Sequence, residues 1–157
     1  MKNKNPLFVV QKHKARNMHY DFRMEISGVL KSWAIPKGPT LNPSMKRLAV
    51  QVEDHPLSYI HFEGTIPEGD YGAGEVIVWD KGECVFSDKK TPAKQYEDGD
   101  LTFELKGHKL KGGYKLLRTN MPGKNDSWLL IKRNDEFVSY GDILIEKPGS
   151  VISLRNI

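Results

Sequence analysis

Residues 13–25 hold the side chains of this sequence that are best suited to chemistry. From His19 onward polar and apolar residues alternate strictly, which indicates a β-strand with one polar and one apolar face. The polar face carries His19, Asp21 and Arg23 in succession, and His13 precedes it by six residues. Two imidazoles and one carboxylate are the ligand set of a divalent-metal site, and a guanidinium beside them suits a phosphate. The alternative is that both histidines are surface residues and that Asp21 pairs only with Arg23.

This ligand set contains nitrogen and oxygen donors but no thiolate, because the only cysteine of the chain is Cys84. Such a site suits Mn²⁺, Fe²⁺, Zn²⁺ or Co²⁺, and these residues alone leave the choice among them open. A lone cysteine also excludes an internal disulfide and a Cys-rich zinc site.

A second alternating segment, residues 47–54, predicts another strand. Its polar face is predicted to carry Arg47, Ala49, Gln51 and Glu53, and its apolar face Leu48, Val50 and Val52. His55 continues the polar face, and Tyr59 follows four residues later and could reach the same cleft. The alternative for His55 is a loop histidine before a proline. The alternative for Tyr59 is a core aromatic residue whose hydroxyl lies at the surface.

Strand signals dominate the rest of the chain, and helical periodicity is scarce. Residues 80–82 predict a hairpin turn, residues 55–74 a long loop or lid, and residues 87–99 a loop with at most one helical turn. The predicted strands are 8–11, 19–26, 29–35, 47–54, 75–79, 83–86, 101–105, 113–118 and 127–132. Short strands between turn residues predict an all-β fold, either a sandwich or a small closed antiparallel β-barrel with long loops. We favour the barrel, because closure removes exposed sheet edges.

The 157 residues carry a net charge of +4 and predict a single domain over 1–157, with 1–6 and about 148–157 flexible. The positive charge favours polyanionic partners only weakly. No apolar run approaches the roughly 20 residues of a membrane span, and the basic start lacks the apolar segment of a signal peptide. We therefore expect a cytoplasmic protein without a membrane partner.

Long segments of the chain match a known family in order. They are FVVQKH at 8–13, HYDFRME at 19–25, LKSWAIPKGP at 30–39, VEDHPL at 52–57, FEG at 62–64, IPEGDYG at 66–72, residues 74–82, and WLLIK at 128–132. With these segments the chain closely resembles the 3′-phosphoesterase domain of the bacterial and archaeal DNA ligase D. The resemblance extends over nearly the whole chain and is far more specific than a short motif.

The resemblance implies a small β-barrel enzyme that uses Mn²⁺, or another divalent ion such as Co²⁺ or Zn²⁺, to repair DNA 3′ ends. A phosphodiesterase step would remove a terminal ribonucleoside, and a phosphomonoesterase step would then convert the remaining 3′-phosphate into a 3′-hydroxyl. By position, the resemblance implies metal ligands at His13, His19 and Asp21, and phosphate-engaging catalytic residues at Arg23, His55 and Tyr59. It implies supporting, substrate-binding roles for Lys37, Arg47 and Glu53.

In the ligase domain an N-terminal arm with an Arg-Asp pair contributes to the phosphodiesterase step, whereas only seven residues precede Phe8 here. We therefore expect the phosphomonoesterase activity to be kept and leave the ribonucleoside-trimming step open. No polymerase or ligase module is visible, so we expect a stand-alone version. Its expected partners are DNA primer–template ends with a 3′-phosphate or 3′-ribonucleotide, and separately encoded ligase, polymerase and Ku proteins.

Two other functions compete with this interpretation. A non-catalytic DNA-end binding module would bind DNA with a steep salt dependence and without a metal. An RNA-directed nuclease or phosphodiesterase could use the same pocket. The ligand set argues against the binding module, because a groove that only binds phosphates needs Lys and Arg rather than two His and an Asp.

Overall fold

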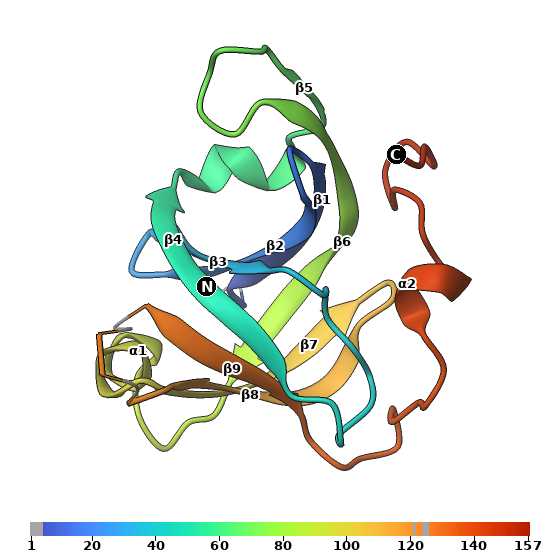
Figure 1. The fold of residues 1–157 in the computed structure, drawn as a ribbon. Helices are drawn as coiled ribbons and strands as arrows, with labels where there is room; N and C mark the ends of the chain where they lie inside the picture. Colours follow the sequence, from blue (N-terminus) through green and yellow to red (C-terminus); the bar gives the residue numbers. More distant parts are fainter. Residues whose placement is uncertain (1–4, 121, 124–125) are drawn as a thin grey trace.

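The computed structural model describes residues 5–120, 122–123 and 126–157. Antiparallel strands dominate the regular structure of these residues, and turns and three short helical segments join them (Figure 1). In chain order the elements are β1 (Leu7–Lys14), β2 (Met18–Ile26), β3 (Val29–Ile35), β4 (Arg47–His55), the 3-10 helix η1 (Leu57–His61), β5 (Gly64–Ile66), β6 (Gly74–Phe86), α1 (Pro92–Asp98), β7 (Asp100–Gly107), β8 (Lys111–Arg118), β9 (Ser127–Lys132) and α2 (Ile143–Glu146).

The strands close into a barrel, which confirms the predicted fold class. In the described part of the chain they form one sheet in the order β1-β2-β3-β4-β9-β8-β7-β6-β5, and a further pairing between β1 and β6 joins its ends. Eight strands of this sheet therefore have a partner on both sides, while β5 pairs only with the start of β6. Closure leaves no long exposed edge in the barrel, so little helix is needed to cover it.

The barrel encloses an aromatic core. The apolar residues of β2 from Tyr20 to Ile26 lie in this core, so the predicted apolar face of the strand is confirmed. All three tryptophans of the chain are fully buried in it, and the rings of Trp33 and Trp128 pack edge to face with centroids 5.4 Å apart. Burial of such large side chains supplies most of the free energy that holds a barrel of this size together.

The predicted hairpin over residues 80–82 is wrong, because β6 runs through them as one strand of 13 residues. Asp80 is fully buried, and its carboxylate accepts hydrogen bonds from the backbone N–H groups of residues 108–110, in the connection between β7 and β8. Gly82 permits close approach of two backbones, since a Cβ there would lie 2.1 Å from the Lys106 carbonyl oxygen. Asp80 and Gly82 are residue types typical of a turn, but here they stabilise the contact of β6 with β7 and with the connection that follows β7.

Strand β4 carries its side chains on the opposite faces from those predicted. Ala49 lies in the aromatic core, whereas Leu48 is 47% exposed, so the predicted polar face points inward. The register between β3 and β4 shifts near its end, where His55 pairs with Leu30. An extra residue in one strand reverses the alternation beyond the shift. His55 therefore lies on the face of the sheet that carries the polar residues of β2.

Helix α1 replaces most of the loop predicted over residues 87–99, and its seven residues exceed the single turn expected. Thr91 caps its start by accepting a hydrogen bond from the Lys94 backbone N–H, and a proline occupies the first turn. Gly99 ends the helix with a positive φ of 71°, a conformation that glycine adopts without strain. These local signals specify a helix although the segment has little apolar periodicity.

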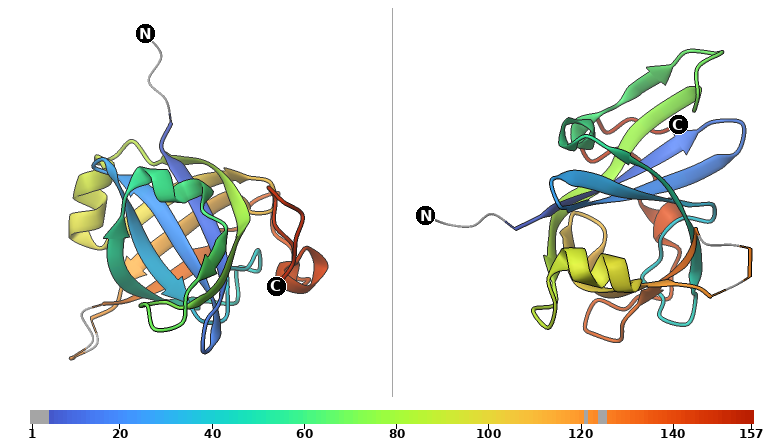
Figure 2. Two further views of the ribbon diagram at one scale, coloured as in Figure 1. Left: turned by 90° about the horizontal axis from the view of Figure 1, so that it is seen from above. Right: turned by 90° about the vertical axis from the view of Figure 1, so that its left-hand side faces the viewer.

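Two segments extend the structure beyond the barrel (Figure 2). The arm formed by β5 and the start of β6 projects from the end of the barrel that lies away from α1. The C-terminal segment lies along β6, where the Val151 N–H donates to the Val78 carbonyl and the Trp79 indole N–H donates to the Lys147 carbonyl. In the described parts of the chain, no helix has the length and apolar character needed to cross a membrane.

Candidate metal and phosphate site

The structure brings most of the predicted site residues into one pocket of about 600 Å³. The pocket lies between β1, β2, the end of β4, η1 and the loop that precedes β6. Seven of the predicted residues line it: His13, His19, Asp21, Arg23, Glu53, His55 and Tyr59. Lys37 is exposed in the turn after β3, and Arg47 lies opposite Leu130 at the start of β4. Neither of these two lines the pocket, and their substrate-binding roles stay predictions.

The hairpin of β1 and β2 positions the centre of the site. His13 belongs to β1, which is longer than predicted, and it pairs directly with His19 across the hairpin. Gln11 pairs with Asp21 in the same register. Because directly paired residues and residues two apart share a face, all four side chains emerge on one side of the sheet. The opposite side of the hairpin faces the aromatic core.

Three ligand atoms converge within this hairpin. His13 Nδ1 and His19 Nε2 lie 3.2 Å apart, and they lie 3.5 Å and 3.3 Å from Asp21 Oδ2. His13 and Asp21 are buried, and His19 is half-buried. Among the described residues, this is the one cluster of His, Cys, Asp or Glu side chains with the spacing to hold a metal ion.

Each imidazole of the cluster is oriented through its other nitrogen. His13 Nε2 lies 2.7 Å from the Gly72 carbonyl oxygen, and His19 Nδ1 lies 3.1 Å from that of Asn17. A carbonyl oxygen can only accept a hydrogen bond, so both of these nitrogens carry hydrogens. In the neutral tautomers the lone pairs of the remaining nitrogens then point toward the carboxylate. Two lone pairs and a carboxylate at this spacing repel one another unless a proton or a metal cation lies between them.

The charges around Asp21 match this arrangement. Burial opposes ionisation of its carboxyl group, but hydrogen bonds from His13 and His19 and the charge of Arg23 outweigh it and hold the pKa of Asp21 well below its usual range. The hydrogen bond to Asp21 raises the pKa of His19 above its usual value, although partial burial opposes the shift. The carboxylate therefore stays ionised, with the Arg23 guanidinium beside it.

Arg23 connects this cluster to the rest of the pocket. Its Nε–H donates to Gln11 Oε1 at 2.7 Å, Nη1 lies 3.1 Å from His55 Nδ1, and Nη2 lies 3.6 Å from Asp21 Oδ2. The guanidinium carbon also lies 5.0 Å from the centroid of the Tyr59 ring. Burial lowers the pKa of Arg23, but a guanidinium stays charged at any pH at which proteins fold.

His55 and Tyr59 line the pocket beside Arg23. Their ring centroids lie 4.6 Å apart, and His55 Nδ1 also lies 3.1 Å from the Glu53 carbonyl oxygen. Burial and the neighbouring Arg23 lower the pKa of His55, which keeps it neutral near pH 7. Burial raises the pKa of Tyr59, so its hydroxyl keeps its proton. Both side chains can therefore donate a hydrogen bond to an anion.

Gln11 was missed in the sequence, although it is fully buried at the centre of this network. Besides accepting from Arg23, its Nε2 donates to the carbonyl oxygens of Tyr59 and Phe62, each at 3.2 Å. It thereby fixes η1 and the guanidinium to β1. The available signal was the amide of Gln11 at the position between Val9 and His13 on one face of the strand.

We expect Gln11→Met to lower the free energy of unfolding by about 1–3 kcal/mol. Methionine fills a similar volume but leaves the buried Arg23 Nε–H and two carbonyl groups without their partner. Urea denaturation of the metal-free protein measures the change. An unchanged midpoint and slope would show that water or another group replaces the amide.

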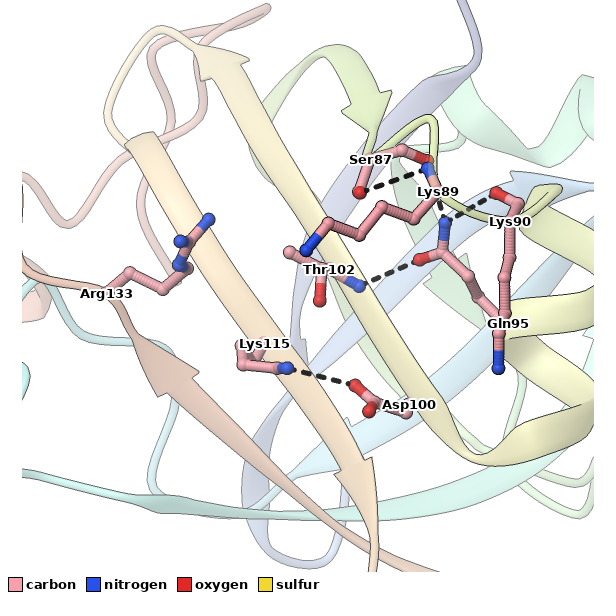
Figure 3. A pocket seen from close by; sticks show the side chains of 8 residues that line it. All are labelled: Ser87, Lys89, Lys90, Gln95, Asp100, Thr102, Lys115 and Arg133. Carbon is pink, nitrogen blue, oxygen red and sulfur yellow. Dashed lines mark hydrogen bonds and ion pairs between the residues drawn. The ribbon is translucent and has the colours of Figure 1, made fainter.

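A second pocket lies over β7 and β8, beside α1 (Figure 3). Its walls carry several cations, of which Lys115 is paired with Asp100 at 3.1 Å. Gln95 fixes its rim through hydrogen bonds to the Ser87 and Lys90 carbonyl groups. It contains no imidazole and a single carboxylate, so it lacks the ligands that distinguish the first pocket.

Fold and site together define a class of protein: a small closed β-barrel that gathers two imidazoles, a carboxylate and a buried guanidinium in one pocket. The sequence places the chain within one family of this kind. The DNA Ligase D 3′-phosphoesterase domain matches residues 11–118, which is more than half of the chain, and the chain therefore belongs to this family. The resemblance found in the sequence motifs is confirmed.

Two relatives show how far the similarity extends. The chain is 53% identical over 153 residues to the multifunctional non-homologous end joining protein LigD of Pseudomonas aeruginosa, a match that covers 96% of this chain and 18% of that protein. It is 48% identical over 122 residues to the multifunctional non-homologous end joining DNA repair protein LigD of Mycobacterium tuberculosis, covering 78% and 15%. The chain thus spans less than a fifth of the length of these relatives.

Proposed function

We propose that this protein is a metal-dependent phosphoesterase that heals DNA 3′ ends during end-joining repair. It would remove a 3′-phosphate to leave a 3′-hydroxyl for a ligase, and the ribonucleotide primer described below tests whether it also removes a 3′-terminal ribonucleoside. One observation carries the proposal: three ligand atoms converge within 3.5 Å of one another, beside a buried guanidinium that faces the same pocket. Membership of the 3′-phosphoesterase family supports it.

The donor set fits a divalent cation, and His13, His19 and Asp21 would hold it. Imidazole and carboxylate ligands suit Mn²⁺, the ion we propose, and also Co²⁺ or Zn²⁺. When bound, such an ion supplies positive charge beside the phosphoryl group and activates water. The hydrogen bonds to the Gly72 and Asn17 carbonyl groups support this assignment, because metal-bound histidines are usually oriented by a bond from their other nitrogen.

Arg23 would hold the phosphate. A guanidinium has five N–H donors, of which Nε–H is used by Gln11, while the two terminal nitrogens contact His55 and Asp21, which line the pocket. Each terminal nitrogen has two N–H groups, so one on each remains for a pair of non-bridging phosphate oxygens even while Arg23 contacts His55 and Asp21. The buried setting strengthens these bonds at the transition state, where the charge on the phosphoryl oxygens must be stabilised.

His55 and Tyr59 would complete the phosphate site. His55 Nδ1 lies 3.1 Å from both Arg23 Nη1 and the Glu53 carbonyl oxygen. In the neutral tautomer whose Nδ1 accepts from Arg23, the hydrogen is on Nε2, and we propose that this group donates to a phosphate or leaving oxygen. The Tyr59 hydroxyl, protonated at neutral pH, can donate to a second oxygen. Neither role requires a covalent nucleophile, so we propose direct attack by water.

The substrates we propose are primer–template DNAs that end in a 3′-phosphate or in one 3′-ribonucleotide. The names of the relatives refer to non-homologous end joining. We therefore propose that ligase, polymerase and Ku proteins are partners in the same repair. The sharpest test incubates the protein with Mn²⁺ and each of these primers, with an all-RNA primer in parallel, and resolves the products on a gel. We expect a 3′-hydroxyl product from the DNA 3′-phosphate. Binding without any cleavage would instead support a non-catalytic end-binding module, and cleavage of the RNA alone would support an RNA-directed enzyme.

The metal proposal also predicts how stability depends on pH. The folded pKa of His19 is raised, so its contribution to stability is full below the unfolded pKa of about 6.5 and is lost as the pH rises through the folded pKa. Without metal, the wild-type protein should therefore lose more stability between about pH 6 and about pH 8.5 than His19→Gln does.

Added Mn²⁺ should oppose the loss of wild-type stability at the higher pH. Protons compete with the ion for the imidazoles, and this competition becomes weaker as the pH rises. Mn²⁺ should thus raise the melting temperature of the wild-type protein more at the higher pH and leave that of His19→Gln almost unchanged. Thermal unfolding with chelator and with Mn²⁺ measures both effects. Equal stabilisation of the two proteins would remove His19 from the ligand set.

A further inference from the structure

The pocket is larger and more apolar than a phosphate requires. Besides the polar cluster it is lined by Ala34, Val52, Ile66 and Val76, with the half-exposed Met18 at its rim. A volume of about 600 Å³ lies within the range of roughly 300–1,000 Å³ that is typical of pockets for whole organic ligands. A phosphate group gains nothing from apolar walls, so these residues indicate a second, apolar part of the ligand.

Tyr71 stands at the edge of this wall with almost no protein contact. Its side chain is 89% exposed although it lines the same pocket. An aromatic ring that packs on nothing contributes little to the stability of the fold, whereas an exposed ring beside a binding pocket offers a flat apolar surface to a ligand.

The backbone beside Tyr71 is tied to the centre of the site. The next residue, Gly72, accepts the hydrogen bond from His13 Nε2 at 2.7 Å, and its φ of +76° favours glycine there. Two turn-forming bonds, from the Asp70 N–H to the Pro67 carbonyl and from the Ala73 N–H to the Asp70 carbonyl, shape the loop. The ring is thus attached one residue away from a group that orients a proposed metal ligand.

We propose that the Tyr71 ring and the apolar wall beside it form a subsite for the base of the terminal nucleotide, whose 3′-phosphate lies at Arg23. The proposal rests on the proposed function and adds a substrate preference to it. Stacking uses the face that every base shares, so the subsite would accept all four bases while favouring nucleotides over small phosphate esters. It requires an unpaired or frayed terminal base.

Primers that carry a 3′-phosphate test this subsite when the terminal nucleotide has either an ordinary base or none. In the wild-type protein kcat/KM should be about 5- to 150-fold higher for the base-bearing strand, the range expected of one base–aromatic stack. Tyr71→Ala should reduce the preference to less than about twofold. Tyr71→Phe and Tyr71→Trp should keep it, because the ring and not the hydroxyl is responsible.

Tyr140→Ala is the matched control, since Tyr140 is 74% exposed and lies outside the pocket. It should keep the full base preference. Fluorescence anisotropy of the same strands without metal provides a readout that does not require turnover, and the base-bearing strand should bind more tightly to wild type but not to Tyr71→Ala. Failure to hydrolyse either strand would contradict the proposed function alone. A base preference that is absent in wild type, or unchanged in Tyr71→Ala, would overturn the subsite.

Discussion

Asp21→Ala and His19→Ala should each abolish the release of phosphate from a 3′-phosphate primer, a loss of at least about a thousandfold in kcat. Each change removes one of three converging ligand atoms, and the remaining two cannot hold a cation with comparable affinity. The fold should persist, because both side chains leave the face of the hairpin opposite the aromatic core. Single-turnover assays with saturating Mn²⁺ measure the loss.

Two further variants separate chemistry from folding. Asp21→Asn keeps the volume and a hydrogen-bonding group beside Arg23 while it removes the charge, and it should be equally inactive. His108→Ala removes an exposed histidine outside the cluster and should keep wild-type activity. Near-wild-type turnover in Asp21→Asn or His19→Ala would contradict the ligand assignment, and inactivity of His108→Ala would show that the loss is not specific to the cluster.

Arg23→Lys should reduce kcat/KM by about 30- to 1,000-fold, equivalent to about 2–4 kcal/mol of transition-state stabilisation. The positive charge is kept, but one ammonium group cannot contact Gln11 and His55 and also present two parallel N–H donors to a phosphate. The measurement is steady-state turnover of the 3′-phosphate primer, with thermal unfolding as a check on folding.

Arg133→Lys is the matched control for this change, because Arg133 lines the separate pocket over β7 and β8 (Figure 3). Its turnover should equal that of the wild type. If Arg23→Lys were as active as Arg133→Lys, a positive charge alone would stabilise the transition state. The proposal that two N–H donors of Arg23 bind the phosphate would then be wrong.

The two strands that carry the cluster follow from local patterns in the sequence, although the predicted strand 8–11 ends before His13 and its pairing with β2 is seen only in the structure. Strict alternation sets the two faces of β2. The six-residue spacing from His13 to His19 permits a short turn between the strands, and this turn places the two histidines opposite one another. The metal-type cluster depends only on this hairpin. For that reason the sequence predicts the cluster better than any other part of the site.

The errors in β4 and β6 arise where distant contacts override local patterns. The alternation in β4 gave the wrong inner face, because Ala49 and not Leu48 fits against the tryptophans of the core. The bulge before His55 then turns this side chain toward the polar residues of β2, as predicted, but the sequence pattern does not indicate the bulge. In β6, Asp80 and Gly82 satisfy partners in neighbouring strands that only the closed barrel brings near.

Two other parts of the site depend on the same long-range closure. Gln11 gains its role only when η1 folds back over β1, which places the Tyr59 and Phe62 carbonyl groups within reach of its amide. The loop that carries Tyr71 is held beside the site by the contact between Gly72 and His13. Neither contact follows from spacing along the chain, because about 50 residues or more separate the partners.

Direct titration of the metal-free protein with Mn²⁺, followed by electron paramagnetic resonance, tests the central claim without relying on catalysis. Wild type and His108→Ala should each bind one ion per chain, and Asp21→Ala should bind none at the same concentrations. If Asp21→Ala bound Mn²⁺ as tightly as wild type does, His13, His19 and Asp21 would not together be its ligands. The proposed metal-dependent mechanism at this site would then be wrong.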